Sequence, residues 1–522
     1  MGVRGPSARL QSPPVSRSQD SGRPVGTIAV WGTFDLDNFG DHLFPRVTEQ
    51  EILSRLDGWR VRPFSPYGSE HPCRMDGGYV AESLGDWSPL RAEELSEAAD
   101  LTLIGGGEII HFKDELLASA YEATPEQLAS RAPSRFFVDG LGADFEQTHP
   151  VVWNAVGIPF VPSPEQAGMI NDAVTRREYV AVRDPLSLER LRACGVERDV
   201  AIVPDLGFLL DRLVAPELLE ERLRYLKFME WYPSDRPALI VQANRSAVPQ
   251  AGELARILEW AQDGTVQADI VLLETGPCHG DDLFADALQK QLSGRTVYRL
   301  PGGLPPEDIL AALWGSCGVI AMSFHATIAA YVYGKPWVIL DLFDQSKLRA
   351  LAETLGAPDQ RGVDGDTVSN AIRVAFSRPP DRAGLPELQR QIDEHFDRVA
   401  EIAFRSWQER GGDPAARIAE LTRQSRLLRQ AYQRTRQRQA VERLVLVDRN
   451  EELRAEQDQL RAEREQLRVE RDQLRAAHDK MVVELARLRH DAGEYQALQD
   501  TKLVRWSEPL RSAYGKIRRS DS

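Results

Sequence analysis

Short apolar segments separated by helix-like stretches recur along most of this 522-residue chain. In the first part of the series, the apolar segments occupy residues 27–32, 101–107, 136–142, 179–184 and 200–208. Most of them lack strict alternation of polar and apolar residues, which is typical of strands buried on both faces of a parallel sheet. Helical stretches such as 185–195 separate several of them. We therefore predict an N-terminal α/β domain over residues 25–212.

A second series of the same kind follows the proline-containing segment 231–237. Its predicted strands are 238–245, 269–276, 296–303, 318–323 and 336–341, and its predicted helices are 253–262, 283–292 and 306–316. We predict a second α/β domain over residues 213–400, so that two doubly wound domains face each other across a cleft. Ligands of such sheets bind beyond the carboxyl ends of the strands.

The composition changes near residue 410, where glycine and proline become scarce and Arg, Glu, Gln and Leu dominate. An apolar residue recurs at every seventh position: Leu446, Leu453, Leu460, Leu467, Leu474, Met481 and Leu488. This spacing predicts a long helix that forms a coiled coil over residues 401–490. The intervening a positions are mostly polar, and glutamates at g face arginines at e, which favours a weak parallel homodimer. A single solvated helix is the alternative.

The two ends of the chain carry different signals. Residues 1–24 are rich in Pro, Ser, Gly and Arg and lack the apolar core of a secretory signal, so we expect a disordered tail. Residues 491–522 combine Leu, Trp and Tyr with Lys and Arg. This basic amphipathic tail fits peripheral contact with an anionic membrane surface, and it fits docking onto its own protein equally well.

The overall composition indicates a cytoplasmic protein. No apolar run approaches the roughly 20 residues of a membrane span. The four cysteines lie far apart, which argues against a disulfide scaffold or a zinc site and fits a reducing compartment. The formal net charge of −15 argues against nucleic acid as a partner. We expect a cytoplasmic location, with the inner face of the membrane as the place where the basic tail would act.

A polar loop follows the first predicted strand. It carries Asp37, Asn38, Gly40 and Asp41 immediately before a helix-like stretch. At the carboxyl end of a strand, such groups are placed to contact a bound ligand. Alternatively, Asp41 merely caps the following helix.

A glycine triplet and a histidine follow two other predicted strands. Gly105, Gly106 and Gly107 end an apolar run, and glycine allows backbone N–H groups to approach an anion. Tight packing is the alternative explanation of the triplet. His325 opens an alanine-rich helix, with Ser323 near the cap position. Its imidazole either points into the cleft or is hydrogen-bonded inside the core.

Several charged residues lie at or near the predicted ends of strands and helices. Arg183, Arg245, Lys335 and Lys347 are each either a phosphate ligand or an ordinary surface charge. Asp205 ends a strand, where it fits a structural role as the cap of the next turn. We find no convincing cluster of metal ligands in the sequence.

The order and spacing of six segments resemble the polysaccharide pyruvyl transferase family. The segments are DNFGD (37–41), IGGGE (104–108), VAVRDPLSLERLRACGV (180–196), VPDLGFLL (203–210), MSFHATIAAYVYGKPWVIL (322–340) and DQSKLRALAETLG (344–356). The resemblance covers roughly residues 26–357. It implies an α/β fold class of two Rossmann-like domains in a glycosyltransferase-B-like arrangement, here followed by the α-helical coiled coil.

The resemblance also implies an enzyme that transfers pyruvate from phosphoenolpyruvate onto two hydroxyl groups of a sugar, giving a ketal and releasing phosphate. The acceptor would be a cell-surface glycan or its lipid-linked precursor. Phosphoenolpyruvate would be a co-substrate, with no cofactor or metal required. His325 would protonate the methylene carbon, and Asp41 and Asp37 would accept hydroxyl protons. Arg183, Lys347 and the glycine turn would bind the donor's anionic groups.

The chain departs from the family pattern at one position. Many members carry arginine two residues before the histidine, whereas this chain has Ser323. Arg245 or Lys347 would then have to bind the anionic groups of the donor. Two other functions stay open: a nucleotide-sugar-dependent glycosyltransferase of the same fold, and a non-catalytic scaffold that assembles through the coiled coil.

Overall fold

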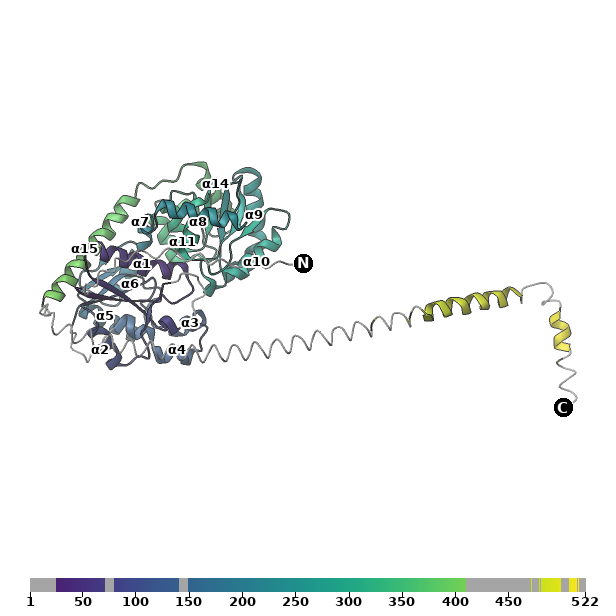
Figure 1. Cartoon of the computed structure of the whole chain (residues 1–522), viewed down its shortest axis with the longest axis horizontal. Coiled ribbons are helices and arrows are strands. Elements are labelled where there is room, and N and C mark those ends of the chain that lie inside the picture. Colours follow the sequence, from purple (N-terminus) through teal and green to yellow (C-terminus); the bar gives the residue numbers. More distant parts are fainter. Residues whose placement is uncertain are drawn as a thin grey trace. The chain divides into compact units, whose positions relative to one another are not determined.

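The computed structural model describes residues 25–70, 79–139, 149–409, 471, 478, 480–498, 507–513 and 515. Residues 1–421 make up one compact unit and residues 422–522 a second one, and each is described by itself. Within the first unit, two α/β domains form separate lobes (Figure 1). The disordered tail that we predict over residues 1–24 lies outside the described residues.

The first domain is built on a parallel sheet, in which the described strands have the order β3-β2-β1-β4-β5-β6-β7. The strands are β1 (Thr27–Trp31), β2 (Arg60–Ser65), β3 (Glu82–Ser83), β4 (Leu101–Gly105), β5 (Val151–Val156), β6 (Tyr179–Val182) and β7 (Ala201–Ile202). The helices are α1 (Phe39–Leu53), α2 (Pro89–Glu97), α3 (Asp114–Ala120), α4 (Pro125–Arg131), α5 (Pro164–Arg176) and α6 (Pro185–Ala193). The central strands are buried along their whole length, which explains their uninterrupted apolar sequences.

The second domain repeats this plan. Its described strands are β8 (Ala238–Gln242), β9 (Asp269–Leu272), β10 (Val297–Arg299), β11 (Gly318–Ala321), β12 (Trp337–Leu340) and β13 (Arg361–Gly362). They form a parallel sheet with the order β10-β9-β8-β11-β12-β13. The helices from the connecting segment onward are α7 (Leu210–Leu213), α8 (Pro216–Phe228), α9 (Ala251–Gly264), α10 (Asp281–Gln291), α11 (Pro306–Gly315), α12 (Phe324–Val332), α13 (Ser346–Thr354) and α14 (Gly365–Ser377).

Both sheets have the strand order of a doubly wound Rossmann fold. The order reverses between β1 and β4 in the first sheet and between β8 and β11 in the second. Open parallel sheets bind ligands at this reversal, in the crevice outside the carboxyl ends of the strands. The prediction of two Rossmann-like domains in a glycosyltransferase-B-like arrangement is confirmed, and the topology places one candidate crevice in each domain.

One predicted strand is wrong. We expect a strand over residues 136–142, but Arg135–Asp139 forms a π-helical turn, and residues 140–148 lie outside the described part of the chain. The strand that pairs with β4 is instead β5, which the sequence analysis misses. Phe136 and Phe137 are fully buried in the turn. Their apolar pattern reports burial, and a short apolar run does not distinguish a buried helical turn from a strand.

Helix α15 (Leu385–Glu409) follows the second domain in sequence but packs on the first (Figure 1). His395, buried on this helix, places Nε2 2.6 Å from Oδ1 of Asn154 in β5. Further along, the Ser406 hydroxyl donates to the carbonyl oxygen of Asp100, at 2.7 Å. We predict that the second domain ends at residue 400, but α15 continues through this position to Glu409. One face of the helix covers the first sheet.

Residues 480–498 of the second unit are helical. Large apolar side chains on this helix are exposed: Met481, Val482, Val483, Leu485, Leu488, Tyr495 and Leu498. The earlier leucines of the heptad series lie outside the described residues, so the coiled coil stays a prediction, as does the role of the tail over 491–522. Among the described helices, none combines the length and the apolar character needed to cross a bilayer.

Candidate active site

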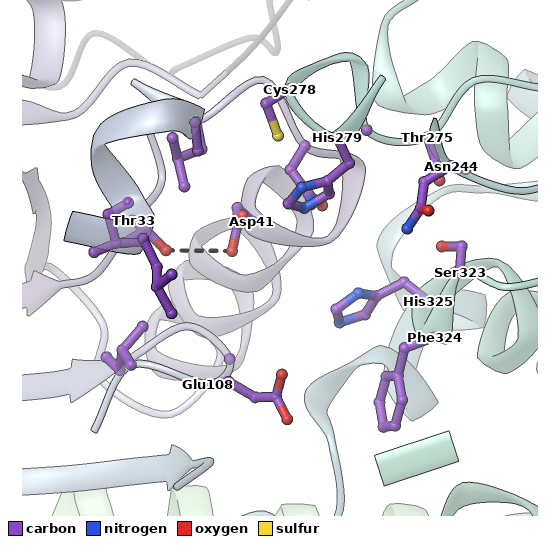
Figure 2. Close-up of a pocket in the computed structure, with 18 of the residues that line it drawn as sticks. Thr33, Asp41, Glu108, Asn244, Thr275, Cys278, His279, Ser323, Phe324 and His325 are labelled. Carbon is purple, nitrogen blue, oxygen red and sulfur yellow. Dashed lines mark hydrogen bonds between the residues drawn. The ribbon is translucent and has the colours of Figure 1, made fainter. Parts of the chain in front are cut away.

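The two places where the strand order reverses face one cavity of about 520 Å³ between the domains, called the first cavity below. The first domain contributes the loops after β1 and β4, and the second domain contributes the loops after β8 and β11. Figure 2 shows Asp41 and Glu108 on the side of the first domain and Ser323 and His325 on the side of the second. Polar groups from both switch points are thus collected at one place.

The loop after β1 is held by the buried carboxylate of Asp35. Its Oδ2 accepts hydrogen bonds from the backbone N–H groups of Tyr67, at 2.8 Å, and Gly68, at 2.7 Å. Its Oδ1 accepts a hydrogen bond from the hydroxyl group of Tyr121, at 2.8 Å. These bonds fix the path of the loop from β1 to α1, so this acidic residue has a structural role.

The start of α1 places Asp41 at the cavity. Asn38 is the capping residue, because its side-chain oxygen accepts a hydrogen bond from the N–H of Gly40, at 2.9 Å. Asp41 lies in the first turn of the helix and accepts a hydrogen bond from the hydroxyl group of Thr33, at 3.3 Å. The capping role that we considered for Asp41 is therefore filled by Asn38, and Asp41 lines the cavity.

His325 lies directly against the start of α1. A Cβ atom at Gly40 would lie 2.0 Å from Nδ1 of His325, so any residue larger than glycine would collide with the imidazole. The His325 side chain keeps 21% of its surface exposed and lines the first cavity. Of the two positions that the sequence leaves open for this ring, the structure has the one at the cleft.

A series of ionisable side chains connects His325 to the opposite domain. Nε2 of His325 lies 3.5 Å from Oδ1 of Asp205, and Oδ2 of Asp205 lies 3.7 Å from Nη1 of Arg183. Nη2 of Arg183 lies 3.3 Å from Oε1 of Glu108. Oε2 of Glu108 then accepts a hydrogen bond from Nζ of Lys347, at 3.0 Å. We call this set of five residues the inner network.

Arg183 holds the centre of the inner network. Its guanidinium lies 4.6 Å from the ring centroid of Phe324, a distance typical of a cation–π contact. Burial opposes its charge, but Glu108, Asp205 and the neighbouring Asp184 hold its pKa above the usual value. A planar guanidinium can pair with two carboxylates and stack on a ring at the same time, which a lysine ammonium cannot do.

The carboxylates of the site differ strongly in proton affinity. Burial raises the pKa of Asp41 to about 7, against the opposing effects of His325 and Thr33. Burial would also raise the pKa of Asp205, but its contacts with His325 and Arg183 lower it to about 2. Asp205 is therefore ionised throughout the neutral range, whereas Asp41 gains or loses a proton close to pH 7.

Gln242, at the end of β8, fixes the part of the first cavity's wall that the second domain contributes. Its Oε1 accepts a hydrogen bond from the N–H of Ser323, at 2.8 Å, and its Nε2 donates to Oδ2 of Asp281, at 2.8 Å. Asp281 also accepts hydrogen bonds from the N–H groups of Thr275, at 2.9 Å, and Gly276, at 3.0 Å. These bonds hold the start of α12 and the loop after β9 in one arrangement.

The two domains touch through the loop after β9. Nδ2 of Asn38 lies 3.1 Å from Nε2 of His279. An amide nitrogen can only donate, so Nε2 accepts and the neutral imidazole carries its proton on Nδ1. Burial lowers the pKa of His279, which agrees with the neutral form. Arg245 donates to the carbonyl oxygens of Cys278 and His279, both at 3.0 Å, and thereby fixes this loop.

The glycine triplet follows β4 as a tight turn. Gly106 and Gly107 have φ angles of +119° and +93°, which favour glycine over residues with a side chain. Both line the first cavity. Gly105 is the last residue of β4, where a Cβ atom would lie 2.7 Å from the ring of Phe44. The triplet therefore combines the two explanations that we considered, with packing at its first position and cavity lining at the others.

The sequence model of one family, polysaccharide pyruvyl transferase, matches residues 38–342. The matched range covers more than half of the chain and contains β4, β8 and β11 together with the loops that follow them. The chain belongs to the polysaccharide pyruvyl transferase family. Among proteins with curated descriptions, none matches this family member in sequence.

Solved structures with a similar fold include two UDP-GlcNAc 2-epimerases. The enzyme from Neisseria meningitidis, bound to UDP-GlcNAc, is 13% identical, with a TM-score of 0.44 over 72% of this chain and 99% of that one. The enzyme from Methanocaldococcus jannaschii is 10% identical, with a TM-score of 0.44 over 70% and 98%. A variant of the wall teichoic acid polymerase TagF is 10% identical, with a TM-score of 0.41 over 75% and 91%.

In this pyruvyl transferase family member, most of the predicted site residues line the first cavity. They are Asn38, Asp41, Gly106, Gly107, Arg183, Arg245, Ser323, His325 and Lys347. Gly40 lies beneath the His325 ring, and Gly105 belongs to the sheet. Asp37 is buried and lines a neighbouring cavity. Among the described residues, no group of three or more His, Cys, Asp or Glu side chains is placed to hold a metal ion.

The sequence analysis misses two members of the inner network. Glu108 directly follows the glycine triplet, a position where an acidic side chain could have been recognised as a site residue. Asp205 does cap the turn that we predict, since its Oδ1 accepts from the N–H of Gly207 at 2.9 Å, but the same carboxylate also contacts His325. His279 and Asn244 line the cavity without any sequence signal that would have identified them.

Proposed function

We propose that this protein transfers the pyruvyl group of phosphoenolpyruvate onto two hydroxyl groups of one sugar in a cell-surface polysaccharide or its lipid-linked precursor. In this reaction C3 of phosphoenolpyruvate gains a proton, two C–O bonds form at C2, and the C2–O bond to phosphate breaks. Of the two hydroxyl protons, one is balanced by the proton on C3 and the other leaves with phosphate. The observation that carries the proposal is the pairing, across one cavity, of His325 in the inner network with Asp41.

Cations around the first cavity support an anionic donor. Phosphoenolpyruvate carries a phosphate and a carboxylate, and both require positive groups or N–H donors. Arg183, Arg245 and Lys347 line the cavity, as does the backbone of the Gly106–Gly107 turn. They supply the positive charge that an arginine at position 323 would have added. We therefore assign donor binding to these residues, with Ser323 acting as the cap of α12.

His325 is the proposed acid. Protonation of C3 makes C2 electrophilic, so that a hydroxyl oxygen can attack it. The ionised carboxylate of Asp205 lies 3.5 Å from Nε2 and holds the ring from which the proton is given up. Asp205 does not itself react; it orients the ring and acts through His325, so we regard it as a positioning residue.

Asp41 is the proposed base. Its pKa of about 7 means that the carboxylate can take a proton from a sugar hydroxyl near neutral pH and release it again. The side chain lines the cavity from the first domain, whereas His325 enters from the second. An acid and a base on opposite domains fit a reaction in which donor and acceptor are bound from opposite sides.

The direct test is phosphate release from phosphoenolpyruvate by the full-length protein in the presence of polysaccharide from its own cells. We expect phosphate release together with a ketal methyl signal in the NMR spectrum of the glycan. His325→Ala should lower the rate by about 10²–10⁴-fold. His490→Ala, an exposed histidine of the helix over 480–498, is the matched control and should retain full activity.

A thermal-shift comparison separates the proposed donor from the alternative. Phosphoenolpyruvate should raise the melting temperature, and UDP- or GDP-sugars should not. No phosphate release together with no stabilisation by phosphoenolpyruvate would reject the proposal. Stabilisation by a nucleotide sugar alone would favour a glycosyltransferase instead, and full cellular function of His325→Ala would favour a scaffold.

The proposed oligomer is a weak parallel homodimer through the C-terminal helix. In the part that the structure describes, Met481, Leu485 and Leu488 are between 51% and 60% exposed, which is costly for apolar side chains unless a partner covers them. A second copy of the same heptad sequence is the expected partner. Sedimentation velocity of the full-length protein should show a concentration-dependent dimer that Leu488→Asp abolishes.

The C-terminal tail is the proposed site of peripheral membrane contact. Residues 491–522 carry Lys and Arg together with Trp, Tyr and Leu, the combination that binds anionic surfaces. Cosedimentation of the full-length protein with vesicles containing anionic lipid, compared with neutral vesicles, tests this. Equal recovery with both vesicle types would argue that the tail docks onto protein instead.

A further inference from the structure

A second cavity of about 880 Å³ lies next to the first. The two cavities share a wall, to which Ser119, Ala120, Arg245 and Cys278 contribute. The remaining lining of the second cavity comes mostly from α4, the segment that links α3 to α4 and the loops near Tyr67 and Asp86 in the first domain, and from the start of α10 in the second. A ligand that extends beyond the first cavity on this side would therefore enter the second one.

The charges of the two cavities differ. The described residues of the second cavity include five carboxylates and two guanidinium groups: Asp37, Glu70, Asp86, Glu122, Asp282, Arg131 and Arg245. The Arg131 guanidinium is paired with Glu70, to which it donates at 2.7 Å, and Arg245 lies in the wall that the second cavity shares with the first. The first cavity, by contrast, has as many cationic Arg and Lys side chains as carboxylates among its described residues.

The reaction requires space for more than one sugar. The acceptor hydroxyl groups must reach Asp41 in the first cavity, and the rest of the glycan must continue from there. The second cavity adjoins the first and offers carboxylates, the amide of Gln127 and the hydroxyl of Ser130 as hydrogen-bonding partners for sugar hydroxyls.

We propose that the second cavity binds the sugar unit next to the one that receives the pyruvyl group, and that this unit carries no carboxylate or phosphate. Hydroxyl and ammonium groups donate hydrogen bonds to carboxylates, whereas an acidic group in the same place would be repelled. The inference rests on the proposed function for the identity of the acceptor as a glycan. It assigns the anionic donor to the first cavity and the non-acidic part of the acceptor to the second.

Direct binding to the full-length protein tests this without turnover. The probes are three β-1,4-linked tetrasaccharides of glucose, glucosamine and glucuronic acid, which differ mainly in charge, each titrated by isothermal calorimetry. We expect the glucose and glucosamine tetramers to bind and the glucuronic acid tetramer to bind about tenfold or more weakly. In the double variant Asp86→Asn/Asp282→Asn, this ratio should fall by about fivefold or more, because two of the repelling charges are gone.

The matched control removes two exposed carboxylates that line neither cavity, in Asp172→Asn/Asp235→Asn. Its binding ratio should stay within about twofold of the native value, because charges on a distant surface are screened by salt. A second variant, Leu283→Trp, narrows the second cavity and should abolish tetramer binding while stabilisation by phosphoenolpyruvate persists. Equal binding of all three tetramers, no binding of any, or tetramer binding by Leu283→Trp would each overturn the inference.

The outcomes also distinguish this inference from the proposed function. If phosphoenolpyruvate fails to stabilise the native protein but the tetramers bind with the expected charge preference, the donor assignment fails and the glycan site remains. If phosphoenolpyruvate stabilises the protein and the tetramers show no charge preference, the donor assignment stands and the second cavity is not the acceptor subsite.

Discussion

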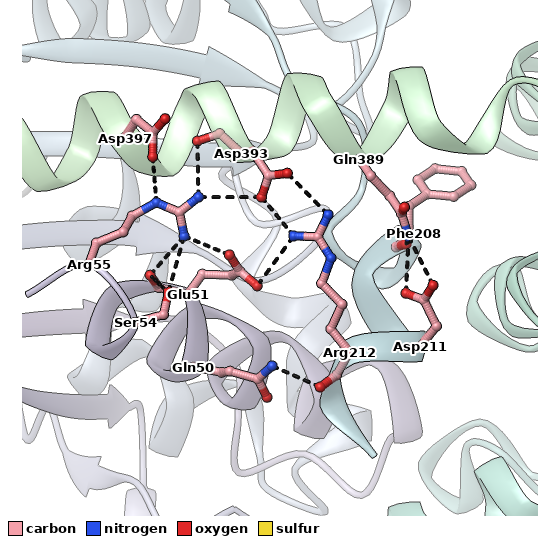
Figure 3. A network of polar contacts seen from close by, with 10 residues as sticks. All are labelled: Gln50, Glu51, Ser54, Arg55, Phe208, Asp211, Arg212, Gln389, Asp393 and Asp397. Carbon is pink, nitrogen blue, oxygen red and sulfur yellow. Dashed lines mark hydrogen bonds and ion pairs between the residues drawn. The ribbon is translucent and has the colours of Figure 1, made fainter. Parts of the chain in front are cut away.

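Two networks of charged residues join segments that are distant in the sequence. The inner network ends at the first cavity, whereas the second, called the outer network, joins helices that pack on one another (Figure 3). The inner network runs from His325 through Asp205, Arg183 and Glu108 to Lys347, and both of its ends line the first cavity. The outer network connects the end of α1, α7 and α15 (Figure 3). Its charged members are Glu51, Arg55, Arg212, Asp393 and Asp397. Both are built from arginines and carboxylates, so residue type does not distinguish them.

The charged groups of the outer network pair with one another, and they do not line the first cavity. Arg55 contacts Glu51 at 2.7 Å, Asp393 at 3.3 Å and Asp397 at 2.6 Å. Arg212 forms a two-pronged pair with Asp393, at 2.7 and 3.0 Å. Hydrogen bonds from Arg212 lower the pKa of Asp393, so its charge is stabilised within the network. Such a cluster stabilises the packing of α15 on the first domain.

The difference teaches where to look for chemistry in this fold. Charged groups that face one another stabilise an arrangement, whereas charged groups that end at a cavity can act on a ligand. The inner network is anchored by buried pairs but presents His325 and Lys347 to the cavity, with Asp41 nearby. The comparison predicts that changes in the inner network affect catalysis first and that changes in the outer network affect stability first.

The largest effect is expected for Asp41→Asn. Loss of the proposed base should lower kcat by about 10²–10⁴-fold, and the native rate should rise with pH through about 7 as Asp41 ionises. Its folded-state pKa is raised above the unfolded value of 3.8, so the stability that the protonated form contributes is lost as the pH rises from about 4 through 7. Asp41→Asn should therefore be more stable than the native protein above pH 7. Parallel kcat and melting curves at pH 5 and pH 8 measure both; loss of stability at pH 8 would contradict the assignment.

Arg183→Lys is expected to have the next largest effect. The ammonium keeps the charge but cannot pair with Glu108 and Asp205 while stacking on Phe324. We expect kcat/KM for phosphoenolpyruvate to fall by about 10²-fold, mostly through KM, since the donor loses a fixed anion-binding group. Arg212→Lys makes the same replacement in the outer network, and its kcat/KM should stay within about twofold of the native value. Equal losses in the two variants would remove the distinction between the networks.

Much of the fold and part of the site could be predicted from the sequence, for reasons that particular residues make clear. Buried parallel strands leave long apolar runs, and glycines such as Gly106 mark turns at their ends. Asp41, Arg183 and His325 follow strand ends and so were recognisable as candidates. Phe136 was misread because a buried π-helical turn and a buried strand have the same composition. The contact of His325 with Asp205, and of Lys347 with Glu108, depends on how two domains meet, which no local pattern encodes.

Asp205→Asn should have a smaller effect that depends on pH. The folded-state pKa of about 2 lies below the unfolded value of 3.8, so Asp205 contributes stability above about pH 4 that is lost as the pH falls towards 2. This contribution amounts to about 2 kcal/mol. The variant should lose that part of the acid dependence in urea unfolding curves between pH 2 and pH 5. Because Asp205 positions the proposed acid His325, we also expect kcat to fall by about tenfold and the alkaline limb of the pH–rate profile to shift. An unchanged profile would leave Asp205 with a structural role alone.

The smallest effect on activity is expected for Asp393→Asn, at the centre of the outer network. The side chain is 33% exposed, so solvent screens its pairs with Arg55 and Arg212 and limits their net contribution to about 1 kcal/mol. The free energy of unfolding from urea titration should fall by that amount, while kcat stays within about twofold of the native value. A cycle of Asp393→Asn and Arg212→Ala, singly and together, isolates the pair energy from other effects of each change. A tenfold loss of kcat with little loss of stability would mean that the packing of α15 affects the geometry of the first cavity. The two networks would then not have separate roles in stability and catalysis.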